Sequence, residues 1–593
     1  MKYIFKSCFV IFFCIVSFSQ AQDKNDTIKT DKLIIIKQYS PTLNDAFKVK
    51  SKPSVSDSIK QTQKTVDYSI FSVPVASTFT PVKGSAGVVK PQKRPYNYQN
   101  YARLGAGNFT NILGQFYGSL FLNRYKKLNI EFDHLSSAGG IDGVVLDDDF
   151  MDTALNLNLE SSERYFNWDA GIGVDYKRYN WYGIDQQNLN TNNQIFGTTL
   201  SAIDPLQTYL GLSANAKLEF DSDYIKTVKL KLNNFSDDYN SSENQVDFNA
   251  NFNVYVQNQK LDIGLDLNYL NGNFEQSFND SNTEIDYGFI TASIYPSYKI
   301  EIDDFTIDLG AKVSFLNDTE YDDTNLNITR SETEFFVYPK IKASYKWSEE
   351  IMFYAGADGD LNHNSYQSIV DQNPFVSPTL FLQPTDNAIS GFAGINGKVG
   401  TLSYNLKTFY KQENDYAFFV ENPAFSVFTP FISQNNFEFS NSFGLIYDDL
   451  STLGINAEFN YAAFDDFNIG ISAQYFNYDV DNIPEPSYLP DFKVNLNANY
   501  QIGEKWYLHS TLFFVGERNS LTYGILPADG IGLMAKDVDS FVDLNFGIDY
   551  QFTERLGFFI SGKNLLDDNY QQWRNYKVQG LQVMGGLSYQ FDW

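Results

Sequence analysis

The sequence predicts an all-β fold: a transmembrane antiparallel β-barrel of about 22 strands, within a range of 18–24. The first observation is composition, because 17% of residues are aromatic while the mean hydropathy is only −0.32. That combination suits strands with one apolar and one wet face. The second is an alternation of apolar and polar residues that persists from about Gln99 to the end. The third is a secretory signal, followed by no apolar stretch of the ~18–20 residues that a spanning helix needs.

Residues 1–21 are expected to be a cleaved signal peptide. Lys2 and Lys6 form a basic start, Phe9 to Phe18 is apolar, and Ala21 ends a small-x-small cleavage site. The apolar run is too short for a membrane anchor. Cys8 and Cys14, the only two cysteines, lie in this segment. The mature chain is therefore expected to have no disulfide and no thiolate chemistry.

Residues 22–96 form a basic, proline-containing leader, which we expect to be extended and periplasmic. From Gln22 to Pro95 there are twelve Lys, one Arg and six acidic residues, a net charge of +7, and six of the 18 prolines. The chain from Tyr96 onward has 29 basic and 66 acidic residues, a net charge of −37. Two interpretations stay open: the basic leader occludes an acidic lumen, or it binds a periplasmic partner.

Residues 97–593 carry the barrel pattern, in segments of ten to fifteen residues separated by Asn, Asp, Gly and Ser. In Val542–Phe552, for example, every second residue is apolar and the residues between are polar or Gly. Segments 123–127 and 503–505 are expected to be tight turns. Segments 135–151, 179–205, 317–332, 363–388 and 518–537 are expected to be longer loops, the asymmetry typical of outer-membrane barrels.

The polar face of these strands is rich in acidic residues, which we expect to line the lumen. Lys or Arg facing lipid at mid-bilayer costs roughly 2–4 kcal/mol, and the apolar faces of the clearest strands carry no charge. The residues predicted to face the lumen are Asp247, Asp262, Asp266, Asp308, Glu458, Asp543 and Asp549. An acidic lumen would favour cations.

The last strand ends on alternating apolar residues, with an aromatic as the final residue. Leu587, Tyr589, Phe591 and Trp593 share one face. This pattern looks like the signal that outer-membrane barrel assembly machinery reads during insertion.

The segment Lys563-Asn564-Leu565-Leu566-Asp567, with Tyr570 after it, resembles the segment that precedes the closing strand of TonB-dependent receptors. Gly580 to Phe591 is similar to that closing strand, and Asn373 to Pro378 resembles a loop of related barrels. The resemblance covers about residues 97–593 and is strongest at the C-terminus. It implies a receptor-like barrel. Such receptors begin with a plug domain of well over a hundred residues, and residues 22–96 do not resemble one, so a plugless member is expected.

Catalytic, cofactor and metal sites are not predicted. His134, His363 and His509 are scattered, and no pair has metal-ligand spacing. Nucleophile and phosphate-binding motifs are missing from the sequence, so an enzyme is not expected. The acidic body disfavours nucleic-acid binding.

The sequence therefore predicts a multi-pass barrel in the outer membrane of a Gram-negative bacterium, acting in transport with partner proteins. The alternative is a structural subunit of an outer-membrane complex for barrel assembly, secretion or surface-lipoprotein handling, with no transport of its own. Expected partners are outer-membrane lipids, the assembly machinery, and outer-membrane or periplasmic proteins bound through residues 22–96. A surface lipoprotein is a further candidate partner.

Overall fold

The structure is a computed structural model that describes residues 98–593, except 186–188, 190–193, 196–197, 258, 279–283, 323–327, 425–434, 465 and 527–529. The predictions for the signal peptide and for the leader fall on residues that lie outside the described ones. Among the described residues, no helix is long and apolar enough to cross a membrane.

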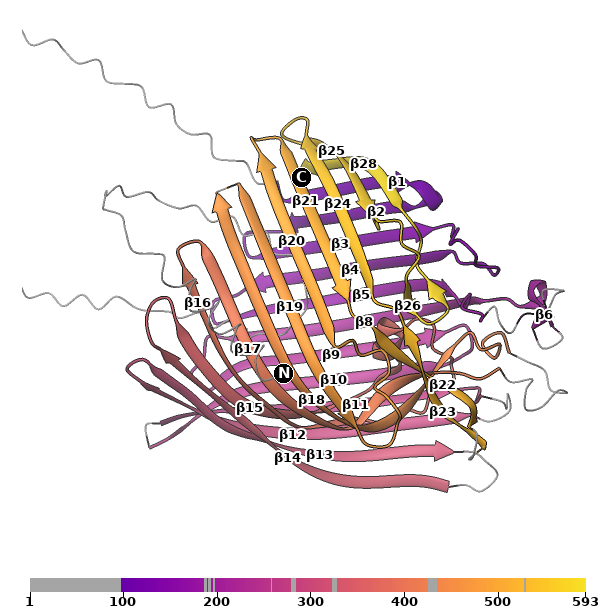
Figure 1. Cartoon of the computed structure of the whole chain (residues 1–593). Helices are drawn as coiled ribbons and strands as arrows, with labels where there is room; N and C mark the ends of the chain where they lie inside the picture. The colour runs from indigo at the N-terminus through magenta and orange to yellow at the C-terminus, as the bar shows by residue number, and fades with distance from the viewer. Residues whose placement is uncertain are drawn as a thin grey trace, which may run out of the picture. The chain divides into compact units, whose positions relative to one another are not determined.

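The chain forms a closed antiparallel barrel of 22 strands, as the sequence predicts (Figure 1). Its main sheet has 24 strands, but β22 (Arg518–Leu526) and β23 (Gly530–Val538) are a separate hairpin that joins the sheet through β17. The ring closes where the first and last strands pair, with Tyr101 opposite Gln590.

The strands of the ring are β1 (Asn100–Gly107), β2 (Ile112–Phe121), β3 (Lys126–Ser137), β4 (Phe150–Ser162), β5 (Phe166–Asn180), β8 (Leu206–Phe220), β9 (Ile225–Asp237), β10 (Ser242–Val256), β11 (Gln259–Phe274), β12 (Ile285–Ile302), β13 (Phe305–Asp322), β14 (Ile328–Lys346), β15 (Met352–Asn362), β16 (Thr385–Val399), β17 (Leu402–Glu421), β18 (Phe443–Phe464), β19 (Phe467–Val480), β20 (Phe492–Ile502), β21 (Trp506–Val515), β24 (Phe541–Gln551), β25 (Leu556–Lys563) and β28 (Gln582–Phe591).

Successive residues of a strand alternate between the outer and inner faces of the ring. On β11, Leu267 and Tyr269 are exposed, whereas Leu270 and Phe274 are fully buried. Leu453 and Ile455 of β18 are likewise exposed. Because a ring of exposed apolar side chains is unfavourable in water and favourable in lipid, the outer face is that of a membrane barrel.

The two ends of the barrel differ. The turn end has short connections, including 122–125 between β2 and β3 and 503–505 between β20 and β21, where the sequence predicts tight turns. The loop end carries the long connections, including 138–149, 181–205, 363–384, 422–442 and 564–581. The first strand begins and the last strand ends at the turn end.

Two segments expected to be loops are largely strand. Within 317–332, β13 continues to Asp322 and β14 begins at Ile328. Within 518–537, the chain forms the β22–β23 hairpin. The first segment is polar on both faces, as a hairpin that projects into water can be, so composition could not separate strand from loop there. The β22–β23 hairpin instead buries Leu521 in a cluster with Phe418 and Leu450, a contact between distant segments that the sequence does not reveal.

Candidate functional site: the loop core and the cavity beside it

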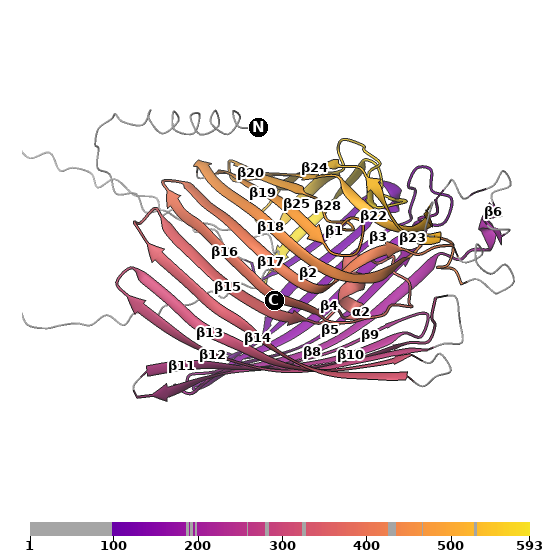
Figure 2. The same cartoon turned by 60° about the horizontal axis from the view of Figure 1, so that its bottom comes forward.

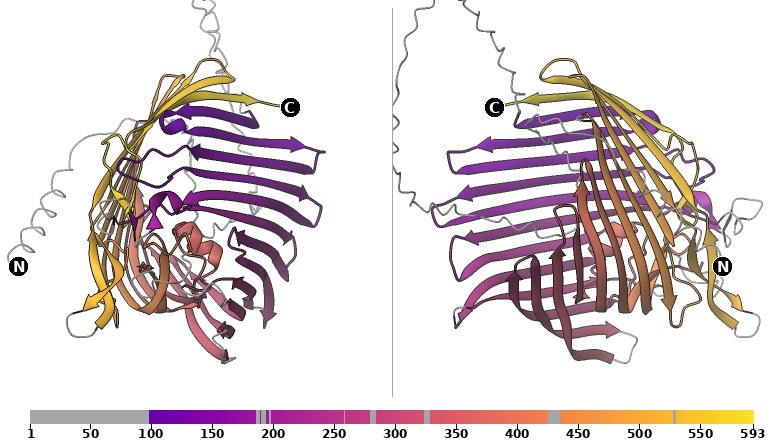
Figure 3. Two further views of the ribbon diagram at one scale, coloured as in Figure 1. Left: turned by 90° about the vertical axis from the view of Figure 1, so that its right-hand side faces the viewer. Right: turned by 60° about the vertical axis from the view of Figure 1, so that its left-hand side comes forward.

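The connection 363–384 folds inward and carries a short helix into the ring of strands (Figure 3). The chain leaves β15 at Asn362 and forms α2 (Tyr366–Gln372). Ser365 precedes the helix, and its side chain accepts a hydrogen bond from the N–H of Ser368 at 3.0 Å. Serine at this position satisfies an N–H that the first turn cannot pair internally.

Two carboxylates of the barrel wall, the buried Glu243 and the half-buried Asp237, hold the start of α2. The carboxylate of Glu243, at the start of β10, accepts hydrogen bonds from the N–H groups of Tyr366 at 2.6 Å and Gln367 at 3.2 Å. The hydroxyl of Tyr287 donates to the same carboxylate at 2.9 Å. The Tyr366 hydroxyl donates to Asp237 of β9 at 2.7 Å. These bonds offset part of the cost of burying the carboxylates, but burial still raises the pKa of Glu243 to about 7 and raises that of Asp237.

The apolar side of α2 packs on aromatic rings of the wall. The fully buried ring of Tyr366 makes edge contacts with Phe274, Phe235 and Tyr209, with ring centroids 4.9, 5.3 and 6.3 Å apart. Val370, one turn later, is also buried. Edge-to-face contacts of this kind stabilise a pair beyond the area that it buries.

The segment after α2 joins other connections of the loop end. Phe375 stacks on Tyr576 with centroids 3.8 Å apart, and it meets the edge of Tyr182 at 5.7 Å. The N–H of Ser377 donates to the carbonyl oxygen of Phe443 at 2.8 Å. These contacts join connections 181–205, 363–384 and 564–581 and the start of β18.

Charged groups complete this assembly. Arg574 forms ion pairs with Glu421 at 2.5 Å and with Asp185 at 3.2 Å. Ser520, on the β22–β23 hairpin, donates to Glu421 at 2.5 Å. The guanidinium of Arg518 donates to backbone carbonyls in the 564–581 connection at 2.9 Å. We call this set of packed connections, centred on 363–384, the loop core.

His363, at the entry to the loop core, is half-buried beside the ring of Phe289. Burial lowers the pKa of His363 to about 4, Lys312 lowers it further, and Asp360 opposes the shift. The imidazole is therefore neutral at neutral pH, and protonating it would place a charge inside the loop core.

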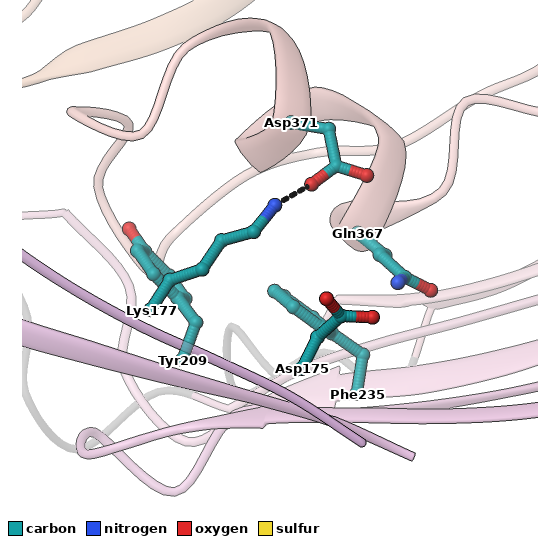
Figure 4. Close-up of a pocket in the computed structure, with 6 residues that line it drawn as sticks. All are labelled: Asp175, Lys177, Tyr209, Phe235, Gln367 and Asp371. Carbon is teal, nitrogen blue, oxygen red and sulfur yellow. Dashed lines mark hydrogen bonds and ion pairs between the residues drawn. The ribbon is translucent and has the colours of Figure 1, made fainter. Parts of the chain in front are cut away.

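A cavity of about 250 Å³ lies between α2 and the barrel wall (Figure 4). It is lined by Asp175 and Lys177 of β5, Tyr209, Phe235, and Gln367 and Asp371 of α2. Lys177 and Asp371 form an ion pair that ties the helix to the wall. With two carboxylates, an ammonium and an amide, the cavity presents polar and charged groups suited to a small hydrophilic solute.

The acidic residues predicted to line the lumen lie on five different strands and form no single site. Three of them form ion pairs: Asp266 with Lys312 at 3.5 Å, Asp262 with Lys260 at 2.9 Å, and Asp549 with Arg103 at 3.5 Å. Two more lie opposite a lysine in the ladder, Asp308 opposite Lys342 and Asp247 opposite Lys231.

Three of these acidic residues accept hydrogen bonds from neutral groups. Asp247 accepts from Gln245 at 3.2 Å, Glu458 from Asn456 at 3.2 Å, and Asp543 from the hydroxyl of Tyr570 at 3.1 Å. Among the described residues, no group of His, Cys, Asp or Glu side chains has the arrangement of a metal site.

The residues of the predicted assembly signal lie at the turn end. Leu587 and Tyr589 of β28 are exposed on one face, and Leu104 of β1 stands exposed opposite Leu587. Phe591 meets Tyr589 at 5.7 Å and Trp593 at 5.3 Å. Their role in assembly stays a prediction.

The anchors of the loop core were not identified from the sequence. Glu243, Tyr366, Glu421 and Arg574 come from segments far apart in the chain, and no local spacing connects them. One signal was available: Tyr366 and Phe375 are large aromatic residues in 363–388, a segment expected to be a loop. Such residues in a connection often indicate that it is packed.

Comparison with known proteins identifies the type of barrel. The model of a family described as TonB dependent receptor-like, β-barrel matches residues 85–565. No curated protein matches the chain.

Solved structures of similar fold are receptors and transporters. The FpvAI–pyocin S2 complex matches with a TM-score of 0.60 and 14% identity, over 84% of this chain and 74% of that chain. The ferric-catecholate import receptor Fiu from E. coli K12 matches with a TM-score of 0.60 and 10% identity, over 84% and 82%. The copper transporter OprC matches with a TM-score of 0.59 and 12% identity, over 84% and 82%. At these identities the likeness establishes the fold.

Proposed function

This chain belongs to the TonB-dependent receptor-like β-barrel family of the Gram-negative outer membrane, and from that premise we propose that it acts in transport across this membrane together with partner proteins. The family consists of transport receptors. The observation that carries the proposal is a closed ring into whose loop end the chain's own connections pack. A barrel of 22 strands is wide enough to hold a path for solutes, and a closure that can open is what controlled passage requires.

We further propose that the lumen of the barrel is acidic and that transport does not require a complete plug domain. Asp266 shares its strand face with Leu270 and Phe274, which pack in the loop core, and Asp308 shares its face with Leu316. These relations support inward orientation of the acidic residues. We expect the loop core to close the loop end independently of any plug. We expect passage to favour cations and small polar solutes.

Ion conductance in a planar bilayer tests the proposal. The full chain is expected to conduct little, whereas replacement of 366–383 by a short Gly-Ser linker is expected to give steady, cation-selective conductance. The matched control is Phe381→Ala, which truncates an exposed aromatic in the same connection. A deletion variant that inserts and runs as a folded barrel but stays silent contradicts transport through the lumen.

We assign the basic leader 22–96 to partner binding. Its charge of +7 also suits occlusion of an acidic lumen, and deletion of 22–95 separates the two roles. Loss of co-purifying periplasmic or outer-membrane proteins with unchanged conductance supports partner binding. Raised conductance supports occlusion.

A structural subunit of an outer-membrane complex is the second candidate. The observation that favours it is the same packed loop core, because a shut loop end suits a barrel that serves as an anchor. Gentle detergent extraction with mass spectrometry, joined to the conductance assay, separates the candidates. Stoichiometric partners, together with no conductance in either chain, indicate a subunit.

A further inference from the structure

Two neighbouring strands of the ring, β14 and β15, pair along only part of their length. We call the unpaired part of the boundary between them the seam. β14 pairs with β13 along its whole length, from Ile328 to Tyr345. Within the described residues, it pairs with β15 only from Lys340 to Lys346. β15 leaves β14 beyond Asp358, where its pairing with β16 also shifts register, and it leads into the loop core. Figure 2 shows β14 running on past this point.

Pro339 stands where the pairing with β15 ends. Proline has no N–H to give to a ladder and is typical of edge strands. From Thr333 to Pro339, β14 therefore has one paired edge, toward β13, and one edge without a β15 partner.

This unpaired edge reaches into the apolar band of the barrel. Tyr345 lies at the turn end of β14, and Phe335 stands ten residues earlier in the strand. Ten residues of strand span roughly 33 Å, which at a strand tilt of ~45° is roughly 24 Å measured across the membrane. Beyond Phe335 the outer face becomes polar, since Thr333 and Asn317 hydrogen-bond at 3.1 Å. The seam from Pro339 to Phe335 thus occupies the outer half of the band.

The side chains at the seam give the unpaired edge an apolar outer face. Phe335 is 71% exposed and Val337 is 70% exposed, which is comparable with Leu104 at 65% on a strand paired along both edges. Edge backbone groups in hydrocarbon have no water to pair with, so an exposed edge at this depth is unfavourable until a strand pairs with it.

The seam is closed on its inner side by side chains. The buried Tyr338 of β14 crosses to β16, where its hydroxyl donates to Asp386 at 2.8 Å. Asp360, near the end of β15, pairs with Lys312 of β13 at 2.6 Å. The inner closure argues against the seam as a route for lipid or solute into the lumen, and leaves the outer edge for docking.

From this geometry we infer that β14 docks an extended, apolar segment of a partner outer-membrane protein, which pairs with Thr333–Pro339 and covers Phe335 and Val337. A second copy of the chain fits poorly. A two-fold axis along the membrane normal would cross the two β14 strands at about twice their ~35–45° tilt, too steep for a ladder. Strand addition meets both needs of the seam, backbone pairing and apolar cover, when the added segment is the edge strand of the partner's own sheet, because its second edge is then already paired. The inference requires the barrel to lie in the membrane but does not require transport.

Photo-cross-linking in intact cells tests the inference. p-Benzoylphenylalanine replaces Phe335 or Val337 in the full chain, and Ile455 serves as the matched control. We expect both seam positions to cross-link to one outer-membrane protein, at sites two residues apart in an extended apolar segment, and Ile455 to give no such adduct. That two-residue step is the signature of strand pairing.

Other results overturn the inference. Adducts only with lipid, adducts with a second copy of the chain, or protein adducts whose sites do not step by two each contradict it. A second measurement uses Phe335→Ala with Val337→Ala, against Leu453→Ala with Ile455→Ala. The seam pair is expected to lower co-purification of the cross-linked partner at least about tenfold, while both variants keep the heat-modifiable mobility of a folded barrel. Equal co-purification of the two variants also contradicts the inference.

Discussion

Truncating the central ring of the loop core is expected to open the 363–384 connection without unfolding the barrel. Tyr366 is fully buried, makes edge contacts with three rings, and donates to Asp237. Replacing a large buried aromatic by Ala costs roughly 3–5 kcal/mol, so Tyr366→Ala raises the open fraction about a thousandfold. Tyr366→Phe keeps the ring and loses one hydrogen bond, about 1 kcal/mol, which raises the open fraction roughly fivefold.

Thiol labelling of a buried position measures this opening. Cys8 and Cys14 are the chain's only cysteines, and with both replaced by Ala a Cys introduced at Val370 is the single thiol. Val370 is buried in α2, so the maleimide labelling rate follows the open fraction. Phe381→Ala is the matched control and should leave the rate unchanged. Equal labelling rates in Tyr366→Ala and the parent chain would refute the loop core as a packed closure.

The same assay checks three further predictions. Because the pKa of His363 is lowered to about 4, the contribution of His363 to loop-core stability is complete above pH ~6.5 and falls by about 2 kcal/mol by pH 5; burial raises the pKa of Glu243 to about 7, and that group acts in the opposite direction, so His363→Gln should make the closure more stable at pH 5 relative to pH 7 than in the parent chain, and an unchanged pH profile contradicts it. Arg574→Met leaves Glu421 buried without its cation, which should destabilise the closure by roughly 3 kcal/mol; a change under about 0.5 kcal/mol counts against the ion pair. Lys177→Met breaks a partly exposed pair with Asp371 and should change labelling less than about fivefold; a much larger change would make this pair the main tie.

Sequence alternation was sufficient to predict the barrel and its 22 strands because each strand records its two environments locally. In Val542–Phe552 every second residue is apolar, and this segment contains β24, from Phe541 to Gln551. Lipid outside and a wet interior impose a period of two on every strand, so a count of alternating segments approximates a count of strands.

The loop core could not be predicted in the same way, because its contacts join residues that are distant in sequence. Phe375 stacks on Tyr576, and Glu243 binds the start of α2 across more than a hundred residues of chain. The resemblance of Asn373–Pro378 to a loop of related barrels marked the right segment but not its partners. The seam at β14 was equally hidden, since Pro339 alone does not reveal which neighbour it lacks.

Ion conductance in planar bilayers tests most directly which element closes the barrel. Three chains are compared: the full chain, the chain without 22–95, and the chain with 366–383 replaced by a short linker. The first two are expected to stay nearly silent, and the third to conduct with cation selectivity. Conductance that appears on removal of 22–95 alone, or silence of all three chains after verified insertion, would contradict closure of a transport path by the loop core.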